Sequence, residues 1–242
     1  MFKYVHVLVA SVVLFLATAI GCLMVVGGSL VLPDMRRFGN WVVRLWGRVG
    51  CAALGLKLDV RGLENIPKEG CLFLINHTSL IDILIFHAVI PKAARFGAKA
   101  ELFSIPLFGW SMKRMGALKI NRGERQAVIR LYQDSVKRVH AGHSFVLAAE
   151  GTRLERPGVG DKLKSGPMIF AISGQFPIVP VTIKGAYEVL PKGRLLPDPS
   201  YLGSRIVVTV LPPVSTKGLT VDDRLSLKRD IQGRMTKAFN ES

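Results

Sequence analysis

The sequence predicts an α/β fold: a mixed, largely parallel sheet flanked by helices, with an N-terminal membrane-associated two-helix element. Three observations predict it. They are a long apolar run near the N-terminus, a later alternation of β-branched and amphipathic segments, and polar motifs that directly follow two apolar segments. Such alternation is typical of a sheet covered by helices. The 242 residues suffice for membrane-anchoring and interfacial helices over 1–55 and one α/β domain over 56–242.

The first element is the apolar run Val5–Leu32, which contains no Lys, Arg, Asp or Glu in 28 residues. As a helix it would reach about 42 Å, which exceeds the roughly 30 Å hydrocarbon core of a bilayer. A signal peptide has a shorter apolar region of about 7–15 residues, so we expect this segment to be retained. Gly27-Gly28 and Pro33 are natural break points, and the length fits either a tilted span or re-entry into one leaflet.

A second helix of different character is expected over Asp34–Leu56. Its basic residues are interleaved with apolar ones, namely Arg36, Arg37, Arg44 and Arg48 with Phe38, Trp41, Val42, Leu45, Trp46 and Val49. Arginines together with tryptophans are typical of the headgroup layer of a membrane. The alternative is a helix packed on the protein's own core. Positive charge after the apolar run favours the inner (cytoplasmic) membrane, with the α/β domain on the cytoplasmic side.

The composition is strongly basic, with 33 Lys and Arg against 17 Asp and Glu and a net charge of +16. Such a balance indicates either a solvated basic face or attraction to a membrane surface or a phosphorylated substrate. The sequence has no zinc-finger spacing, RNP-like motif or basic-region heptad, so we expect no nucleic-acid partner. Three cysteines without a CxxC motif favour a reducing compartment over a disulfide framework.

From Lys57 onward the signals alternate between strand and helix. Strands are expected at Lys57–Arg61, Cys71–Ile75, Ala94–Ala98, Ala117–Ile120, Ser144–Ala148, Ile178–Ile183 and Arg205–Leu211. Helices are expected at Ser79–Val89, after Pro106 in a first turn, and at Glu124–His140, Pro167–Ser173 and Leu219–Phe239. The polar stretch Gly151–Lys164 is expected to be a loop.

The first polar motif is Asn76–Asp82, which begins where the predicted strand Cys71–Ile75 ends. In open α/β sheets, functional sites gather at the carboxyl ends of strands. A hydroxyl needs a base before it can act as a nucleophile, and histidine suits that task near neutral pH. A carboxylate one helical turn further on, Asp82, can orient the ring of His77. The alternative is a helix cap formed by Ser79 or Asp82 beside an incidental histidine.

The second polar motif is Glu150-Gly151-Thr152-Arg153, which again follows an apolar strand directly. The planar fork of an arginine suits a phosphate group. A glycine lets the backbone approach a ligand closely. The alternative is a turn that carries a surface arginine.

Taken together and in this order, the motifs resemble the 1-acyl-glycerol-3-phosphate acyltransferase family, within the wider group of glycerophospholipid acyltransferases. The matching blocks are Asn76–Asp82 (an NHxxxxD signature), Lys99–Leu102 with Ile105–Gly109 and Ile120–Arg122, Glu150–Arg153 followed by Lys164–Gly166, and Val179–Ile183. The resemblance covers about Leu56 to Leu211. Ala148-Ala149, Leu154 and Thr78 depart from the usual Phe-Pro, Ser and Gln, and none of these departures removes a charged group.

The resemblance implies that His77 deprotonates an acceptor hydroxyl and that Asp82 orients it. It implies attack on the thioester of acyl-CoA or acyl carrier protein, with the oxyanion held by backbone N–H groups near the first block or its helix start. The substrate-binding residues that it implies are Lys99, Arg122, Glu150, Gly151, Thr152 and Arg153, with Lys99 and Arg153 as phosphate contacts. It implies no metal and no cofactor besides the acyl donor.

The most favoured acceptor is 1-acyl-glycerol-3-phosphate, which would give phosphatidic acid in phospholipid biosynthesis. Lyso-ornithine lipid, another lysophospholipid or glycerol-3-phosphate are alternatives within the same chemistry. A lipid hydrolase is a different class, but it needs a G-x-S-x-G nucleophile elbow, which the sequence lacks. A non-catalytic membrane scaffold is a third class, and it would not need His77, Asp82 and Arg153 in one cleft.

Overall fold

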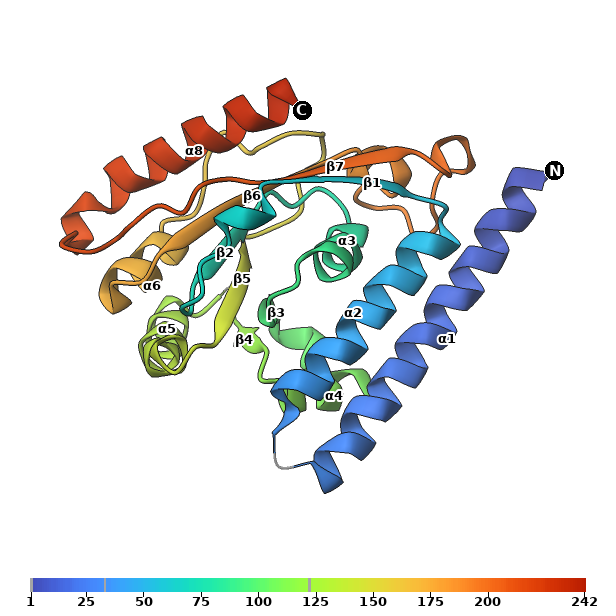
Figure 1. The fold of residues 1–242 in the computed structure, drawn as a ribbon, viewed down its shortest axis with the longest axis horizontal. Coiled ribbons are helices and arrows are strands. Elements are labelled where there is room, and N and C mark those ends of the chain that lie inside the picture. The colour runs from blue at the N-terminus through green and yellow to red at the C-terminus, as the bar shows by residue number, and fades with distance from the viewer. Residues whose placement is uncertain (1, 33, 122) are drawn as a thin grey trace.

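The computed structural model describes residues 2–32, 34–121 and 123–242. Within these residues, seven strands form one sheet in the order β1-β7-β6-β2-β5-β3-β4 (Figure 1). The strands are β1 Lys57–Arg61, β2 Leu72–Ile75, β3 Ala94–Lys99, β4 Leu118–Ile120, β5 Ser144–Ala148, β6 Ile178–Lys184 and β7 Arg205–Val210. Strands β6 and β7 pair antiparallel, and the other neighbouring pairs are parallel. The predicted fold class, a mixed and largely parallel sheet, is confirmed.

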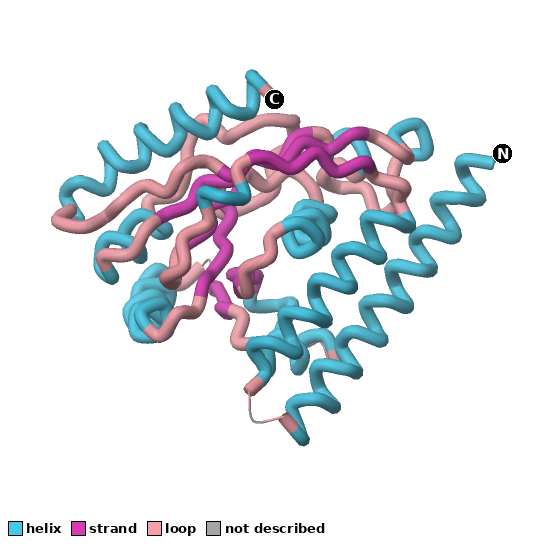
Figure 2. The backbone as a smooth tube through the Cα atoms, viewed as in Figure 1, coloured by secondary structure: helices cyan, strands magenta, loops and turns pink. Residues whose placement is uncertain are grey.

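Helices cover both faces of this sheet, whose strands are magenta in Figure 2. They are α1 Phe2–Val31, α2 Met35–Ala53, α3 Ile81–Val89, α4 Phe108–Met115, α5 Arg125–His140, α6 Gly166–Gly174, α7 Ala186–Val189 and α8 Arg224–Glu241. Residues of α2 and α3 pack on one face, and residues of α5, α6 and α8 pack on the other. The short helix α7 was not predicted, and α8 begins later than expected because a 3-10 turn at Val221–Asp223 precedes it.

The central strand β2 divides its side chains between two hydrophobic cores. Phe73 and Ile75 belong to the core under α3, whereas Leu72 and Leu74 belong to the core under α5 and α6. Successive side chains of a strand point to opposite faces, and a strand buried on both faces is apolar throughout. The strand therefore holds the residues that follow it, beginning with Asn76, at a fixed point on the sheet edge.

Helix α2 packs directly against the backbone of α3. A Cβ at Gly47 would lie 2.6 Å from the carbonyl oxygen of Leu84 and 2.7 Å from the amide nitrogen of Ala88, so only glycine permits this approach. Cys51 and Leu54, at the end of α2, are buried in the core that also contains Phe73 and Ile75. The alternative drawn from the sequence, a helix packed on the protein's own core, therefore describes this face of α2.

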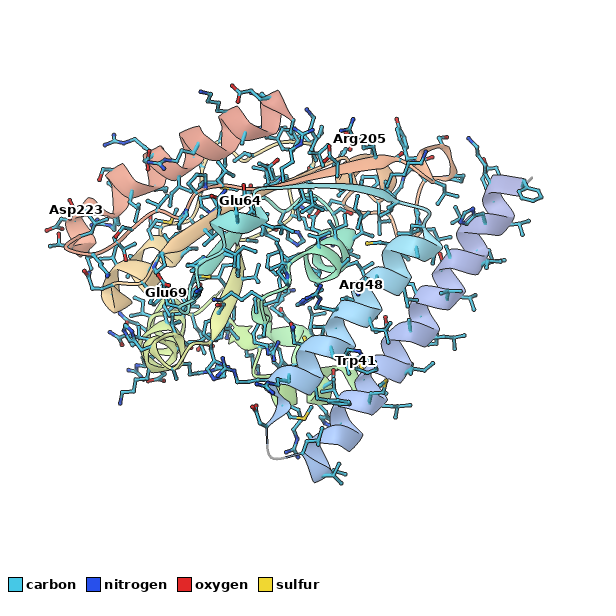
Figure 3. The ribbon with its side chains drawn as sticks, in the orientation of Figure 1. Trp41, Arg48, Glu64, Glu69, Arg205 and Asp223 are labelled. Atoms are coloured by element: carbon cyan, nitrogen blue, oxygen red, sulfur yellow. The ribbon has the colours of Figure 1, made fainter. Side chains whose placement is uncertain are left out.

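The opposite face of α2 carries a basic groove lined by Arg37, Asn40, Trp41, Arg44, Leu45 and Arg48. Trp41 is 52% exposed, and Figure 3 labels it on α2 together with Arg48. Trp46, which the sequence grouped with Trp41, faces inward: its Nε1 donates to Thr18 Oγ1 at 2.9 Å. That part of the prediction was wrong, because five residues along a helix rotate a side chain by about 140°.

Helix α1 is the one described helix long and apolar enough to cross a membrane. It runs beside α2 along one side of the molecule (Figure 1). It continues through Gly27-Gly28, where the sequence had suggested a break. Gly28 leaves space for the Phe38 ring, which packs where a Cβ of residue 28 would lie. Most of its apolar side chains, including Leu8, Phe15 and Leu30, stay exposed.

The segment before α4 also differs from expectation. Helix α4 begins at Phe108, so Pro106 precedes the helix instead of occupying its first turn. Leu107 has a positive φ of 62°, and the N–H of Phe108 donates to the carbonyl of Pro106 at 2.6 Å. This tight turn, which non-glycine residues rarely adopt, redirects the chain after Lys99.

Candidate active site

The site is anchored by Asn76, the first residue after β2. Its buried side-chain amide donates to the carbonyl oxygens of Ile183 and Gly158, both at 3.0 Å, and accepts from the Ile183 N–H at 2.8 Å. One side chain thus joins the ends of two neighbouring parallel strands to the loop that follows β5. The next residue, His77, starts from a rigid point because these bonds fix its backbone.

His77 and Asp82 form a hydrogen-bonded pair, with 2.9 Å between His77 Nδ1 and Asp82 Oδ2. Asp82 lies in the first turn of α3 and is fully buried, while the His77 side chain is 14% exposed. Because the carboxylate accepts at Nδ1, the ring carries its proton there and keeps its lone pair on Nε2. No described residue is hydrogen-bonded to Nε2, so this atom is available to a substrate proton.

The loop that holds this pair uses its own backbone N–H groups. Those of Thr78 and Ser79 both donate to Asp82 Oδ2 at 2.8 Å, and that of Ile81 donates to Ser79 Oγ at 3.3 Å. The N–H of His77 donates to Glu150. These four N–H groups already have acceptors, so the expectation that N–H groups near this block or its helix start hold the oxyanion stays a prediction about the other N–H groups there.

Glu150 lies at the end of β5 and turns its carboxylate toward the backbone. Its Oε2 accepts from the His77 N–H and its Oε1 from the Gly160 N–H, each at 3.1 Å. The residue is only 4% exposed, and this burial raises the pKa of Glu150 to about 6 even though both N–H groups favour the charged form. Its contacts fit a residue that positions His77, whereas the sequence counted it among the substrate-binding residues.

Replacing Glu150 with Gln is expected to lower kcat more than it changes KM. A Gln can accept one of the two backbone hydrogen bonds but presents its NH₂ group to the other donor. An unpaired buried donor costs about 1–3 kcal/mol. The pKa of Glu150 is higher in the folded protein than in the unfolded chain, so the wild type loses stability as pH rises from about 4.5 through about 6. The Gln variant has no such group, so its stability deficit relative to the wild type should be smaller above pH 6 than below pH 4.5.

The measurement is steady-state kinetics and thermal unfolding of both proteins between pH 4.5 and 8. Glu155→Gln is the matched control, because the Glu155 carboxylate is exposed and pairs with Lys192. If the Glu150→Gln enzyme had an unchanged kcat and a raised KM, Glu150 would instead be a substrate-binding residue, as the sequence predicted.

Gly151 and Thr152 line a cavity of about 710 Å³ at the carboxyl ends of β3, β4 and β5. Lys164 and Glu150 contribute polar atoms, and the rest of the lining is largely apolar, from Ile120, Val128, Ile129, Tyr132, Leu147 and Ile169. Gly151 has a φ of +69°, and a Cβ there would lie 3.0 Å from Lys164 Cγ. The glycine is therefore required by both the turn and the cavity wall.

The remaining predicted site residues make fewer contacts with the pair. Lys99 ends β3 at the same sheet edge, is exposed, and forms an ion pair with Glu101 at 2.8 Å. Arg153 is half-buried and follows the turn at Gly151. Arg122 lies outside the described residues. The structure thus brings His77, Asp82 and Glu150 into one hydrogen-bonded unit. Lys99 and Arg153 lie outside this unit.

Three residues that support this unit or the turn beside it had no assigned role in the sequence: Asn76, Gly160 and Lys164. Asn76 stands beside His77 in the first block, so its neighbourhood was a usable signal. Gly160 and Lys164 lie in the loop after Arg153, and their contacts with Glu150 and Gly151 depend on how that loop returns to the sheet. No periodicity or spacing reveals such a return.

Comparisons with known proteins agree on one family. The model of the acyltransferase family matches residues 57–184. A chloroplastic 1-acyl-sn-glycerol-3-phosphate acyltransferase of Brassica napus is 29% identical over 176 residues, or 71% of this chain and 50% of that protein, so the chain spans about half the length of this relative. A lyso-ornithine lipid O-acyltransferase of Pseudomonas aeruginosa is 28% identical over 220 residues, or 85% of this chain and 79% of that protein.

The fold also matches a solved structure, that of the 1-acyl-sn-glycerophosphate acyltransferase PlsC from Thermotoga maritima. The TM-score is 0.82 with 22% sequence identity, and the match covers 99% of this chain and 97% of that one. The similarity therefore includes the two N-terminal helices as well as the sheet.

Proposed function

The chain belongs to the acyltransferase family, and on that premise we propose that it transfers a fatty acyl group from acyl-CoA or acyl carrier protein to the hydroxyl of a lysolipid. The first acceptor to test is 1-acyl-glycerol-3-phosphate, because the Brassica napus relative is named for it. The observation that carries the proposal is the 2.9 Å contact between His77 Nδ1 and Asp82 Oδ2 at the carboxyl end of a parallel strand.

The proposed reaction begins with the acceptor hydroxyl beside His77 Nε2. The nitrogen takes the hydroxyl proton while the oxygen attacks the thioester carbonyl carbon, whose own oxygen becomes negative. The tetrahedral intermediate then collapses, the carbon–sulfur bond breaks, and the leaving thiolate takes the proton from Nε2. Asp82 keeps its hydrogen bond to Nδ1 throughout and stabilises the ring while it is positively charged.

The surroundings of the pair suit the two ends of a lysolipid. We assign the acceptor phosphate to Lys99 and Arg153, with Arg122 beside them in the family pattern, because cationic side chains at one sheet edge attract phosphate. Gly151 and Thr152, which directly precede Arg153 in the chain, line the cavity at the carboxyl ends of the strands. The apolar wall of this cavity is suited to an acyl chain.

Lyso-ornithine lipid is the second candidate acceptor. It is favoured by the Pseudomonas aeruginosa relative that carries this name and aligns with 85% of the chain. That acceptor has no phosphate, so it would depend less on Arg153. Comparing Arg153→Gln with the wild type on both acceptors separates the two candidates.

The decisive experiment assays the purified protein with acyl-CoA and acyl carrier protein donors against each acceptor, with product identification by mass spectrometry. We expect phosphatidic acid as the main product and no covalent acyl-enzyme when the acceptor is omitted, because the acceptor hydroxyl attacks the thioester directly. A stable acyl label on Ser79 or Cys71 would contradict direct transfer. Release of free fatty acid without any acylated product would contradict the acyltransferase assignment.

We also propose that the active site works at the cytoplasmic face of the inner membrane, held there by α1 and by the basic groove of α2. The groove has charge and tryptophan suited to anionic headgroups, and each basic residue near such lipids contributes about 1 kcal/mol to membrane binding. Helix α1 adds an exposed apolar surface. Whether α1 spans the membrane or re-enters one leaflet can be read from an N-terminal tag: a tag reached only from the cytoplasm indicates re-entry.

Changing Arg36, Arg37, Arg44 and Arg48 together to Gln is expected to weaken activity on vesicles most at low salt and with anionic lipid, because salt screens exposed charges. The protein should stay attached through α1. A triple variant that keeps Arg36 is the matched control and should still show the salt- and lipid-dependent loss, since the Arg36 guanidinium donates to the Gly142 carbonyl and does not line the groove. Equal activity on neutral and anionic vesicles in wild type and variant would remove the role of the groove.

A further inference from the structure

A second concentration of positive charge lies at the other edge of the sheet, away from His77. Arg95 is near the amino end of β3, whereas Lys99 ends the same strand at the active-site edge. Four residues of a strand span about 13 Å. Whatever Arg95 binds is therefore separate from the proposed substrate contacts.

Arg95 is a buried guanidinium with little to neutralise it. It is 7% exposed, and its hydrogen bond from Nη1 to the carbonyl of Ala94, the preceding residue in its own strand, is long at 3.3 Å. None of the ion pairs among the described residues includes it. A buried charge ordinarily has an ionic partner, because its desolvation is costly otherwise.

Two further arginines come to the same place from other elements. Arg36, at the start of α2, donates to the Gly142 carbonyl at 3.1 Å, and Arg138, near the end of α5, donates to the Gly116 carbonyl at 2.7 Å. Both partners are neutral, so neither bond cancels a positive charge.

Contacts place these groups in one neighbourhood. A Cβ at Gly39, about one turn after Arg36 on α2, would lie 3.8 Å from Arg95 Nη2, and the Arg138 guanidinium lies 4.7 Å from the ring centroid of Phe145, which pairs with Arg95 across β5 and β3. Burial, followed by the charges of Arg138 and Arg36, lowers the pKa of Arg95 to about 10, so Arg95 stays protonated at neutral pH. Burial and the same charges lower the pKa of His143. The negative charge of Asp34 has the opposite effect and raises the pKa of Arg95. The Asp34 carboxylate also accepts a hydrogen bond from the backbone N–H of Arg36 at 2.8 Å.

We propose that Arg36, Arg95 and Arg138 form a binding site for a phosphate group, distinct from the active site. Three guanidinium groups in one neighbourhood suit the several oxygens of a phosphate, which would supply the missing negative charge. Arg36 follows Val31, the last residue of α1, by five residues, and Leu30 and Val31 are exposed, so the phosphate of an anionic phospholipid can bind the arginines while its acyl chains reach the end of that helix. The inference does not depend on the proposed acyl transfer.

The test measures binding to purified full-length protein in dodecyl maltoside, through the thermal unfolding midpoint as a function of ligand concentration. The probes are inorganic phosphate and mixed micelles containing phosphatidylglycerol or phosphatidylcholine. We expect phosphatidylglycerol to stabilise the wild type, and Arg36→Gln and Arg95→Gln to weaken its apparent affinity by about tenfold, as expected for loss of one charge-assisted hydrogen bond. Arg130→Gln, which removes an exposed charge from the same helix as Arg138, is the matched control and should leave affinity unchanged.

The outcomes separate the sources and the sites. Stabilisation by phosphatidylglycerol but not by inorganic phosphate identifies a lipid headgroup site, and stabilisation by both identifies a general phosphate site. Arg153→Gln should keep the effect in full, because Arg153 belongs to the proposed active site. Equal affinities in wild type and Arg36→Gln, or loss of the effect in Arg153→Gln instead, would overturn the proposal. Arg36 is exposed, so its variant remains informative even if Arg95→Gln fails to fold.

Discussion

Replacing His77 with Ala is expected to reduce turnover by about 10²–10⁴-fold, the usual cost of losing a general base. The ring is the only part removed, and the backbone N–H that donates to Glu150 stays in place. The folded structure should therefore survive, with an unchanged circular dichroism spectrum and little change in KM. Turnover would be measured on purified protein with saturating donor and acceptor.

Asp82→Asn tests the same unit through its second member. Asp82 Oδ2 alone accepts the His77 Nδ1–H and both backbone N–H groups. An amide oxygen there carries no charge, and the amide NH₂ must either replace Oδ1, which is buried with no hydrogen-bond partner among the described residues, or turn toward Nδ1. The ring is then free to adopt the tautomer that lacks a lone pair on Nε2, and turnover should fall steeply. Asp134→Asn, an exposed carboxylate on α5, is the control. Near-normal turnover in a purified His77→Ala protein would remove the proposed mechanism.

Deleting residues 1–55 is expected to release the protein from membranes and to abolish activity on long-chain lysolipids. The deletion removes the exposed apolar surface of α1 and the basic groove of α2. It also removes Cys51 and Leu54 from the core under α3 and uncovers the α3 backbone at Leu84, where Gly47 packs. Since α3 carries Asp82, we expect the His77–Asp82 pair to lose its support.

Two readouts distinguish anchoring from positioning. Flotation with vesicles reports attachment, and turnover on a short-chain, water-soluble acceptor reports the state of the active site without a membrane. Loss of both activities indicates that α2 supports the site directly. If the released truncation kept full activity on long-chain lysolipid, residues 1–55 would be an anchor only.

The arrangement of the site could be anticipated in part because it follows from strand direction. Asn76–Asp82 and Glu150–Arg153 each follow an apolar segment, and the carboxyl ends of neighbouring parallel strands meet at one sheet edge. Strands β2 and β5 are such neighbours, with Ile75 opposite Ala148. The proximity of His77 and Glu150 was therefore within reach of the sequence. The pairing of His77 with Asp82 was expected from one helical turn, but α3 begins only at Ile81, so a loop that precedes the helix brings His77 to the carboxylate.

The contacts of Glu150 could not be anticipated, because its partners are backbone groups that no residue type encodes. The His77 N–H and the Gly160 N–H reach the carboxylate only after β2, β5 and the following loop are in place. The same holds for Arg95, which the sequence presents as one basic residue in a strand. Its burial beside Arg36 and Arg138 depends on where α2 begins and where α5 ends relative to β3.

By itself, the sequence determined the order of the helices and strands, the mixed sheet, and the motifs that mark the acyltransferase family, because periodicity and local motif spacing are properties of short segments. Only the tertiary structure decided which face of α2 is buried, that Trp46 points inward while Trp41 stays exposed, and that Glu150 holds the backbone of His77. The physical reason is that burial and hydrogen-bond partners are set by elements distant in the chain, and their packing geometry is not written in any one segment.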